Sequence, residues 1–222
     1  MAVPIKYIFR VNNIYIKTLA DNTEIANDTA ANLSWSKGYV NFKQNIRVHL
    51  KLAHNGRCAF CRCKVSVGTS WSNLEHLVSK TDYPQFKFQS DNLVYCCTKC
   101  NMSKVRQNTL TNPHPDRTQQ VFPNNSVGFE IINPYYDDFQ GHLDFIDDII
   151  IVVANNSNKG RETIRLYKLY RPELAEERAS ELQLDQQTVN QQLLARLTST
   201  TIDQGTIDQI NAVIAQMPTW TL

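Results

Sequence analysis

The chain has 222 residues, of which 42% are hydrophobic and 20% are charged. This composition is typical of a globular protein and excludes a chain that is disordered throughout, and the length suffices to bury a core without disulfides. No apolar stretch approaches the roughly 20 residues of a membrane-spanning helix, and the N-terminus lacks the apolar core of a secretory signal. We therefore expect a cytoplasmic protein with no membrane partner.

Charge is divided unevenly along the chain, although the net charge is only +2. Residues 1–117 carry 16 Lys and Arg against 7 Asp and Glu, whereas residues 118–222 carry 7 against 14. A surface with excess positive charge attracts polyanions directly and through the release of their condensed counterions. The N-terminal half is therefore expected to face nucleic acid, unless its charges only solvate the surface.

The first half of the chain contains one clear helical pattern. Residues 1–20 mix β-branched and polar residues and are predicted to be strand or irregular, and residues 21–34 to be polar loop or short helix. Apolar residues recur at helical spacing over residues 39–53, which predicts an amphipathic helix. Gly56 is suited to end this helix in a left-handed conformation.

The second half of the chain is expected to be mainly helical after two short strands. Runs of β-branched residues predict strands over residues 129–132 and 149–153. Helix is expected from residue 162 onward, and Pro172 suits the first turn of a helix. A break near Asp185 is an alternative to one continuous helix.

The cysteines form a pattern that predicts a structural zinc site. The sequence holds two Cys-x-x-Cys pairs, which are Cys58 with Cys61 and Cys97 with Cys100. Each pair can turn two thiolates toward one metal ion, and two pairs complete the tetrahedral four-sulfur site that zinc accepts. Redox chemistry at one pair and buried free thiols are the alternatives. Cys63 and Cys96 are surplus; Cys96 could replace Cys97, but Cys97 repeats the spacing of the first pair.

Residues with catalytic potential lie between and just after the two cysteine pairs. Glu75 and His76 are adjacent, Asn92 follows, and Asn101 comes directly after the second pair. A closed four-sulfur site has no coordination position left for substrate, so the zinc is expected to hold the architecture. Chemistry is then expected from the residues that the cysteines clamp.

This order of residues resembles the motif of the HNH endonucleases, which have a ββα-metal fold. A softer likeness over about residues 45–180 is closest to the HNH nuclease subunit of Septu-type and related retron anti-phage systems. The resemblance gives His76 the role of general base, and Glu75 and Asn101 the role of ligands to a catalytic Mg²⁺ or Mn²⁺. It makes Asn92 the central asparagine, which holds the hairpin loop and steadies the histidine. It also implies three contacts with the nucleic-acid backbone: Lys104, Lys80 and Arg106.

Taken with the cysteine pattern, the resemblance implies an α+β protein. It comprises an N-terminal segment (1–41) of uncertain structure, a zinc-stapled ββα-metal HNH core (42–125) and a mainly helical C-terminal region (126–222). The implied function is metal-dependent hydrolysis of phosphodiester bonds in nucleic acid, expected to be DNA, as the nuclease effector of a bacterial anti-phage system with an ATPase partner. The alternative is a non-catalytic zinc module that binds nucleic acid or protein.

Overall fold

The computed structural model describes residues 9–65 and 74–199. These residues form helices and two small antiparallel sheets, which is the mixed α+β class expected from the sequence. The chain divides into two compact units, residues 1–178 and 179–222. The predicted division at residues 41 and 125 follows motif boundaries and stays a prediction. No helix within the described ranges is long and apolar enough to cross a bilayer.

Two helices open the first unit. The helical alternative for residues 21–34 is confirmed by α1 (Leu19–Ala30), which Thr18 begins with a capping box. The predicted amphipathic helix is α2 (Val40–Ala53), and Gly56 has a φ of +66° just after its end. Three side chains of α2 are completely buried: Phe42, Ile46 and Leu50. Their spacing of four residues places them on one face, as the sequence predicted.

A short hairpin and a helix follow α2. Strand β1 (Leu74–His76) pairs antiparallel with β2 (Leu93–Tyr95), with His76 opposite Leu93. Helix α3 (Thr98–Lys104) begins directly after the hairpin, and the side chain of Cys97 caps it. The helix thus begins three residues before Asn101, because the Cys97 thiol caps it.

A second hairpin consists of β3 (Leu143–Ile146) and β4 (Ile150–Val153). Strand β4 confirms the strand predicted over residues 149–153, although only Ile151 in it is buried. The strand predicted over residues 129–132 is wrong: this segment makes a single bridge and otherwise runs as loop. Its apolar side chains serve the core without belonging to a sheet.

Two helices follow the second hairpin. Helix α4 (Asn158–Tyr167) begins four residues before the predicted point because Ser157 caps it, accepting from the Gly160 N–H. Helix α5 (Pro172–Ser199) begins at the predicted proline and continues without the considered break near Asp185. The rest of the predicted helical region, residues 200–222, lies outside the described residues.

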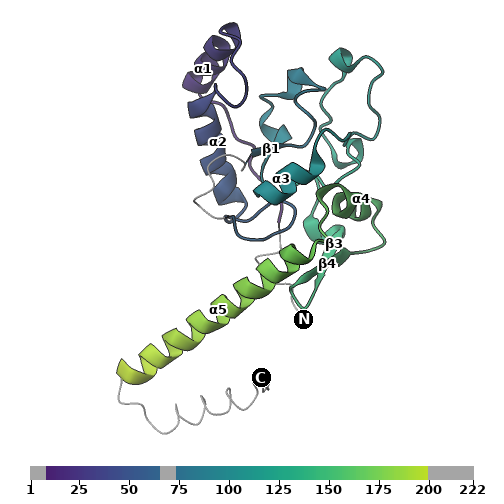
Figure 1. The fold of residues 1–222 in the computed structure, drawn as a ribbon. Helices are drawn as coiled ribbons and strands as arrows, with labels where there is room; N and C mark the ends of the chain where they lie inside the picture. The colour runs from purple at the N-terminus through teal and green to yellow at the C-terminus, as the bar shows by residue number, and fades with distance from the viewer. Residues whose placement is uncertain (1–8, 66–73, 200–222) are drawn as a thin grey trace. The chain divides into compact units, whose positions relative to one another are not determined.

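The first hairpin lies in the middle of the first unit (Figure 1). Helices α1 and α2 lie on one side of it, and α4 with the β3–β4 hairpin lies on the other. The Tyr135 hydroxyl, from the segment before β3, donates to the carbonyl oxygens of Ser90 and Leu93 at 3.0 and 2.6 Å. The ring of Tyr167 on α4 stacks on Phe60 with centroids 3.5 Å apart. The two hydrogen bonds of Tyr135 therefore anchor the start of β2 to the segment before β3.

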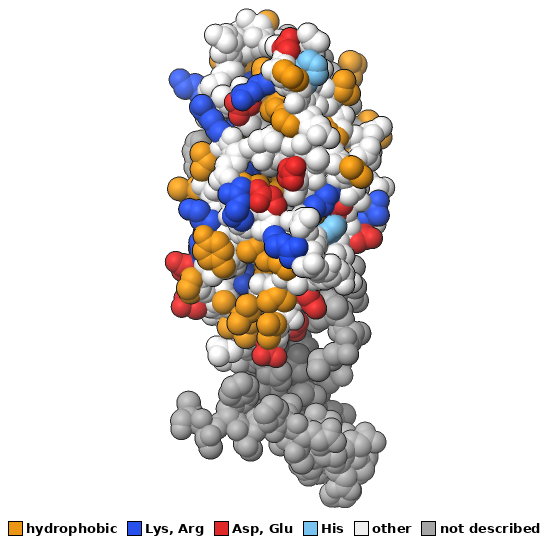
Figure 2. Space-filling view, turned by 90° about the vertical axis from the view of Figure 1, so that its right-hand side faces the viewer, with side chains coloured by type: hydrophobic (Ala, Val, Ile, Leu, Met, Phe, Trp, Pro, Cys, Tyr) orange, Lys and Arg blue, Asp and Glu red, His pale blue; other side chains and the backbone are white. Residues whose placement is uncertain are grey.

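Positive charge is not all at the surface. Three basic residues of the N-terminal half are buried: Arg57, Arg62 and Lys104. Figure 2 shows one face of the molecule, on which lysine and arginine side chains are interleaved with acidic ones and hydrophobic side chains gather toward one end. The basic excess of residues 1–117 is thus partly an internal feature, which balances buried negative groups.

Candidate active site and cysteine cluster

Four cysteine sulfurs gather at the junction of the two knuckles. The Sγ atoms of Cys58, Cys61, Cys97 and Cys100 all lie within 4.8 Å of one another. Sulfurs bound to one tetrahedral zinc ion lie about 3.8 Å apart, and the Cys61 and Cys97 sulfurs are separated by 3.7 Å. The Cys97 Sγ also accepts a hydrogen bond from the Cys100 N–H at 3.5 Å. This buried group can hold a metal ion such as zinc.

The two surplus cysteines lie beside the cluster without belonging to it. The Cys96 thiol lies 3.9 Å from the Cys58 sulfur and donates to the Cys97 carbonyl oxygen at 3.4 Å. The Cys63 thiol donates to the Leu174 carbonyl oxygen at 3.7 Å. The group of four therefore contains Cys97 and not Cys96, as the equal spacing of the two pairs indicated.

Positive groups surround the buried thiols. Burial raises the pKa of Cys58, but hydrogen bonds from neighbouring thiols, that of Cys100 foremost, outweigh burial and lower this pKa well below its usual value. Arg62 is completely buried and donates to the Cys58 carbonyl oxygen at 3.0 Å. Burial lowers the pKa of Arg62 to about 10, while the negative charge of Cys58 opposes that shift. The positive end of α3 also lies at Cys97, so the helix favours thiolates.

A cavity of about 240 Å³ opens between the first hairpin and the end of α3. Its wall contains six of the predicted site residues: Glu75, His76, Lys80, Asn101, Lys104 and Arg106. Successive strand residues normally point to opposite faces, but β1 ends at His76, so both of its last two side chains reach the same cavity. The structure thus brings together side chains that are up to 31 positions apart in the sequence, from 75 to 106.

The imidazole of His76 is held from two sides. Its Nε2 lies 3.0 Å from the carbonyl oxygen of Lys87, which can only accept, so Nε2 carries a proton. In the neutral ring Nδ1 then has the free lone pair. Burial lowers the pKa of His76 well below its usual value, and the neighbouring cation of Lys80 adds to this effect. The ring of Trp35 contacts the imidazole edge-on, with centroids 4.7 Å apart.

The carboxylate of Glu75 is paired with a buried lysine. The Lys104 Nζ donates to Glu75 Oε1 at 2.9 Å and to the His76 carbonyl oxygen at 2.7 Å. Lys104 is only 1% exposed and Glu75 8%. Burial raises the pKa of Glu75, and the Lys104 cation partly offsets this. In this arrangement the ammonium of Lys104 faces inward, so it meets a phosphate only by leaving Glu75.

Asn92 stabilises the loop that joins the two strands of the first hairpin. Its Oδ1 accepts from the Val78 N–H at 2.7 Å, and its Nδ2 donates to the carbonyl oxygens of Val78 and Phe86 at 3.1 and 3.0 Å. The side chain is completely buried and does not line the 240 Å³ cavity. Asn92 therefore acts on the site through the loop, because it bonds to the carbonyl oxygen of Phe86, one residue before the Lys87 carbonyl that holds the His76 ring.

The chain turns sharply where α3 ends. Val105 has a φ of +53°, which a β-branched residue rarely adopts. This turn separates Lys104, whose side chain is buried, from Arg106, whose exposed side chain lines the cavity. Burial lowers the pKa of Lys80, and the cations of Lys104, Lys87 and Arg106 lower it further against the opposing pull of Glu75. The cavity wall therefore carries an excess of positive charge.

Sequence reasoning missed Trp35 and the carbonyl group of Lys87. Trp35 lies between α1 and α2, in the segment for which no role was predicted, and its carbonyl oxygen accepts from the Lys43 Nζ at 2.8 Å. An aromatic residue among polar neighbours was the only signal for it. A main-chain carbonyl leaves no signal in a sequence, because every residue has one.

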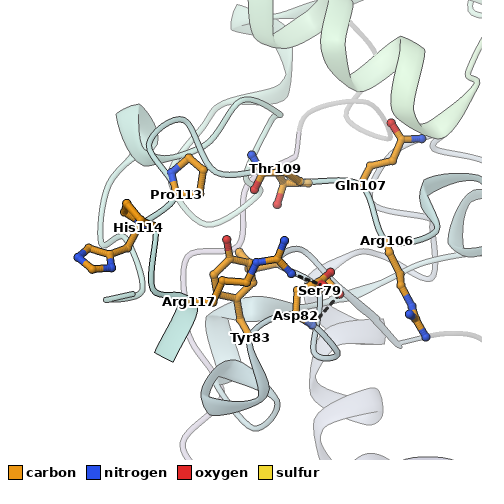
Figure 3. Close-up of a pocket in the computed structure, with 12 residues that line it drawn as sticks. Ser79, Asp82, Tyr83, Arg106, Gln107, Thr109, Pro113, His114 and Arg117 are labelled. Carbon is orange, nitrogen blue, oxygen red and sulfur yellow. Dashed lines mark hydrogen bonds and ion pairs between the residues drawn. The ribbon is translucent and has the colours of Figure 1, made fainter. Parts of the chain in front are cut away.

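A second cavity, of about 320 Å³, adjoins the first (Figure 3). Ser79 and Arg106 line both cavities. The second cavity also receives side chains from the loop that follows α3, among them His114 and Arg117. Neither side chain was assigned a role from the sequence.

Comparison with known proteins places the chain near one group of curated proteins, although it matches no known family profile. It is 31% identical over 151 residues to the Septu protein PtuB of Bacillus mycoides (strain KBAB4), covering 61% of this chain and 50% of that protein. It is 23% identical over 138 residues to the Septu protein PtuB of Bacillus thuringiensis, covering 62% and 44%. The predicted resemblance to a Septu component is confirmed. The chain spans about half the length of the curated relatives it matches.

Proposed function

We propose that this chain is a metal-dependent HNH endonuclease that hydrolyses phosphodiester bonds of DNA. The observation that carries the proposal is the 240 Å³ cavity, in which His76, Glu75 and Asn101 meet beside basic side chains. The order β1, β2, α3 around this cavity supports a ββα-metal core, with the cysteine cluster bracing the hairpin against the helix. The histidine that lines the 320 Å³ cavity, His114, is exposed, whereas His76 is only 3% exposed.

His76 is the general base in this proposal. Hydrolysis of a phosphodiester needs a water molecule that loses a proton as it attacks phosphorus. Because the Lys87 carbonyl holds the Nε2 proton, Nδ1 of the neutral ring is the atom that accepts the proton from water. The depressed pKa keeps the ring neutral and ready for this role at cellular pH.

Two different metal ions fit the two sites. The four sulfurs suit zinc, because they all lie within 4.8 Å of one another and those of Cys61 and Cys97 are 3.7 Å apart, close to the spacing in a tetrahedral thiolate site. Magnesium or manganese, bound through the oxygens of Glu75 and Asn101, would supply positive charge to the phosphate oxygens. Two protein oxygens are few, which suits an ion that keeps several waters and takes further ligands from the substrate phosphate.

The cations of the cavity wall bind the nucleic-acid backbone in this proposal. In the described residues neither Lys80 nor Arg106 has an ion-pair partner, and the mutual repulsion of these cations is relieved when an anion enters. Lys104 holds Glu75 in place, and it can contact phosphate once a divalent ion has taken over that carboxylate. Asn92 keeps the loop that carries the Lys87 carbonyl.

The biological role follows from the resemblance to Septu proteins. We infer that the chain is the nuclease effector of an anti-phage defence system and works with an ATPase partner. The 31% identity to a Septu protein PtuB supports this context. To test the partnership, the chain is co-expressed with the neighbouring genes of its own locus and purified by affinity. An ATPase is expected to co-purify at constant stoichiometry.

Plasmid cleavage tests the nuclease activity. Purified protein with Mg²⁺ or Mn²⁺ is expected to nick or linearise DNA, and His76→Ala is expected to lose at least 100-fold in rate, the general-base contribution. His49→Ala is the matched control, because His49 is a half-buried histidine on α2 that does not line the cavity. RNA and single-stranded DNA, offered in parallel, show whether duplex DNA is the preferred substrate. Equal cleavage by wild type and His76→Ala refutes the assigned base.

One observation favours the non-catalytic alternative. The buried ion pair with Lys104 already neutralises Glu75, so the site is complete without a divalent ion. A module that only binds nucleic acid would retain its affinity in the presence of EDTA and after His76→Ala. The same plasmid experiment, read by gel shift in addition to cleavage, separates the two functions.

A further inference from the structure

The 320 Å³ cavity lies beside the candidate active site. It is enclosed by two segments, residues 78–83 and 106–117. Figure 3 shows Ser79, Asp82, Tyr83 and Arg117 along one side and Thr109 and Pro113 across from them. Ser79 and Arg106 line this cavity and the candidate active site as well, so the two hollows are neighbours along one surface.

The charges around this second cavity suit an anionic ligand. Arg106 and Arg117 both line it, and Asp82 is the one acidic residue among its lining side chains. The Arg117 Nη1 lies 2.6 Å from Asp82 Oδ1, so the charges of these two side chains neutralise each other. The positive charge of Arg106 is then not balanced by an acidic side chain of the cavity lining. The side chain of Arg117 is 58% exposed, so the remaining N–H groups of Arg117 can reach solvent or a ligand.

The walls of this cavity are held in place by hydrogen bonds. The Thr109 hydroxyl donates to the Leu77 carbonyl oxygen at 2.8 Å, directly behind the first hairpin. The Arg117 carbonyl oxygen accepts from the Gln85 Nε2 at 2.6 Å. The guanidinium of Arg117 also lies over the ring of buried Tyr83, 5.8 Å from its centroid. The cavity is therefore preformed, and a ligand need not order it.

We propose that the 320 Å³ cavity is a subsite for the nucleotide next to the scissile phosphate, with Arg117 and Arg106 contacting its phosphate. This inference rests on the proposed nuclease function and extends it from one phosphodiester to a polynucleotide strand. A volume of about 320 Å³ lies at the lower end of pockets that hold small ligands, which suits one nucleotide. The contacts are to the backbone, so they position the strand without selecting a base sequence.

Arg117→Gln tests the subsite, because Arg117 lines this cavity and not the candidate active site. The substrates are a DNA oligonucleotide and bis(p-nitrophenyl) phosphate, a diester with no nucleotide beside its phosphorus. The ratio of kcat/KM for the oligonucleotide to that for the small diester is expected to fall about tenfold, through KM, as for a lost charged hydrogen bond. The salt dependence of oligonucleotide binding, measured in the His76→Ala background, is expected to lose about one counterion.

Arg161→Gln is the matched control, because Arg161 is an exposed arginine on α4 that lines neither cavity. A double variant, Asp82→Asn with Arg117→Gln, removes both members of the ion pair and guards against effects of an unpaired Asp82. An unchanged ratio and salt slope in an active Arg117→Gln enzyme overturns the subsite alone. A wild-type protein that hydrolyses neither substrate overturns the proposed function instead.

Discussion

Replacing Lys104 by methionine removes the cation from a buried ion pair while keeping the apolar length of the side chain. Glu75 then either stays charged without a partner or takes up a proton. Protonation sets the upper limit of the cost, about 1.4 kcal/mol for each pH unit above the ordinary pKa of about 4.3. This limit is about 3.7 kcal/mol at pH 7 and about 1.6 kcal/mol at pH 5.5.

Urea unfolding of wild type and Lys104→Met at these two pH values tests the argument. The free energy of unfolding of the variant is expected to be about 3 kcal/mol below that of wild type at pH 7. At pH 5.5 the difference is expected to be about 1 kcal/mol, because the carboxyl group is neutralised more easily in acid. The double variant Glu75→Gln with Lys104→Met is expected to recover most of the loss at pH 7. A loss that is equal at both pH values, or is below about 1 kcal/mol at pH 7, would show that Glu75 does not depend on Lys104.

Three further predictions concern other parts of the site. The protein as purified is expected to contain one zinc ion per chain by elemental analysis. The Cys97→Ala variant is expected to lose both the zinc ion and cooperative unfolding, and full zinc content in that variant contradicts the cluster. Trp35→Ala is expected to lower kcat for DNA about tenfold with little change in KM, whereas Trp35→Phe keeps most of the activity; a change confined to KM would argue against positioning of His76. Because burial lowers the pKa of His76, the unfolded state binds its proton first, so acidification from pH 6.5 to 5.5 costs up to about 1 kcal/mol of stability. The His76→Gln variant is expected to lack this contribution to the pH dependence of stability. Equal losses of stability in wild type and variant on acidification would contradict a buried neutral ring.

Local patterns in the sequence were sufficient to predict several parts of the fold. Helix α2 has its apolar residues on one face, and the two Cys-x-x-Cys pairs place four sulfurs together. Both features depend on residues that are close in the sequence or repeat a fixed spacing. The resemblance to a known motif, and no local pattern, provided the six predicted site residues that line the 240 Å³ cavity.

Features that depend on tertiary contacts were not predictable. Residues 129–132 read as a strand because Phe129, Ile131 and Ile132 are apolar, but tertiary burial of these side chains does not require a sheet. Strand β3 was missed because Asp144 interrupts its short apolar run. The inward orientation of Lys104 also depends on packing, since a lysine after a cysteine knuckle is ordinarily exposed.

The main-chain carbonyl that holds the His76 ring has a consequence for sequence variation. An acceptor that belongs to the backbone survives any substitution that preserves the path of the loop, so residue 87 is free to change without altering which ring nitrogen is basic. Loss of the Lys87 cation would relieve its lowering effect on the pKa of His76, but the ring nitrogen that carries the proton would stay the same. The tautomer of His76 thus depends on the path of the loop main chain and not on the side chain at position 87.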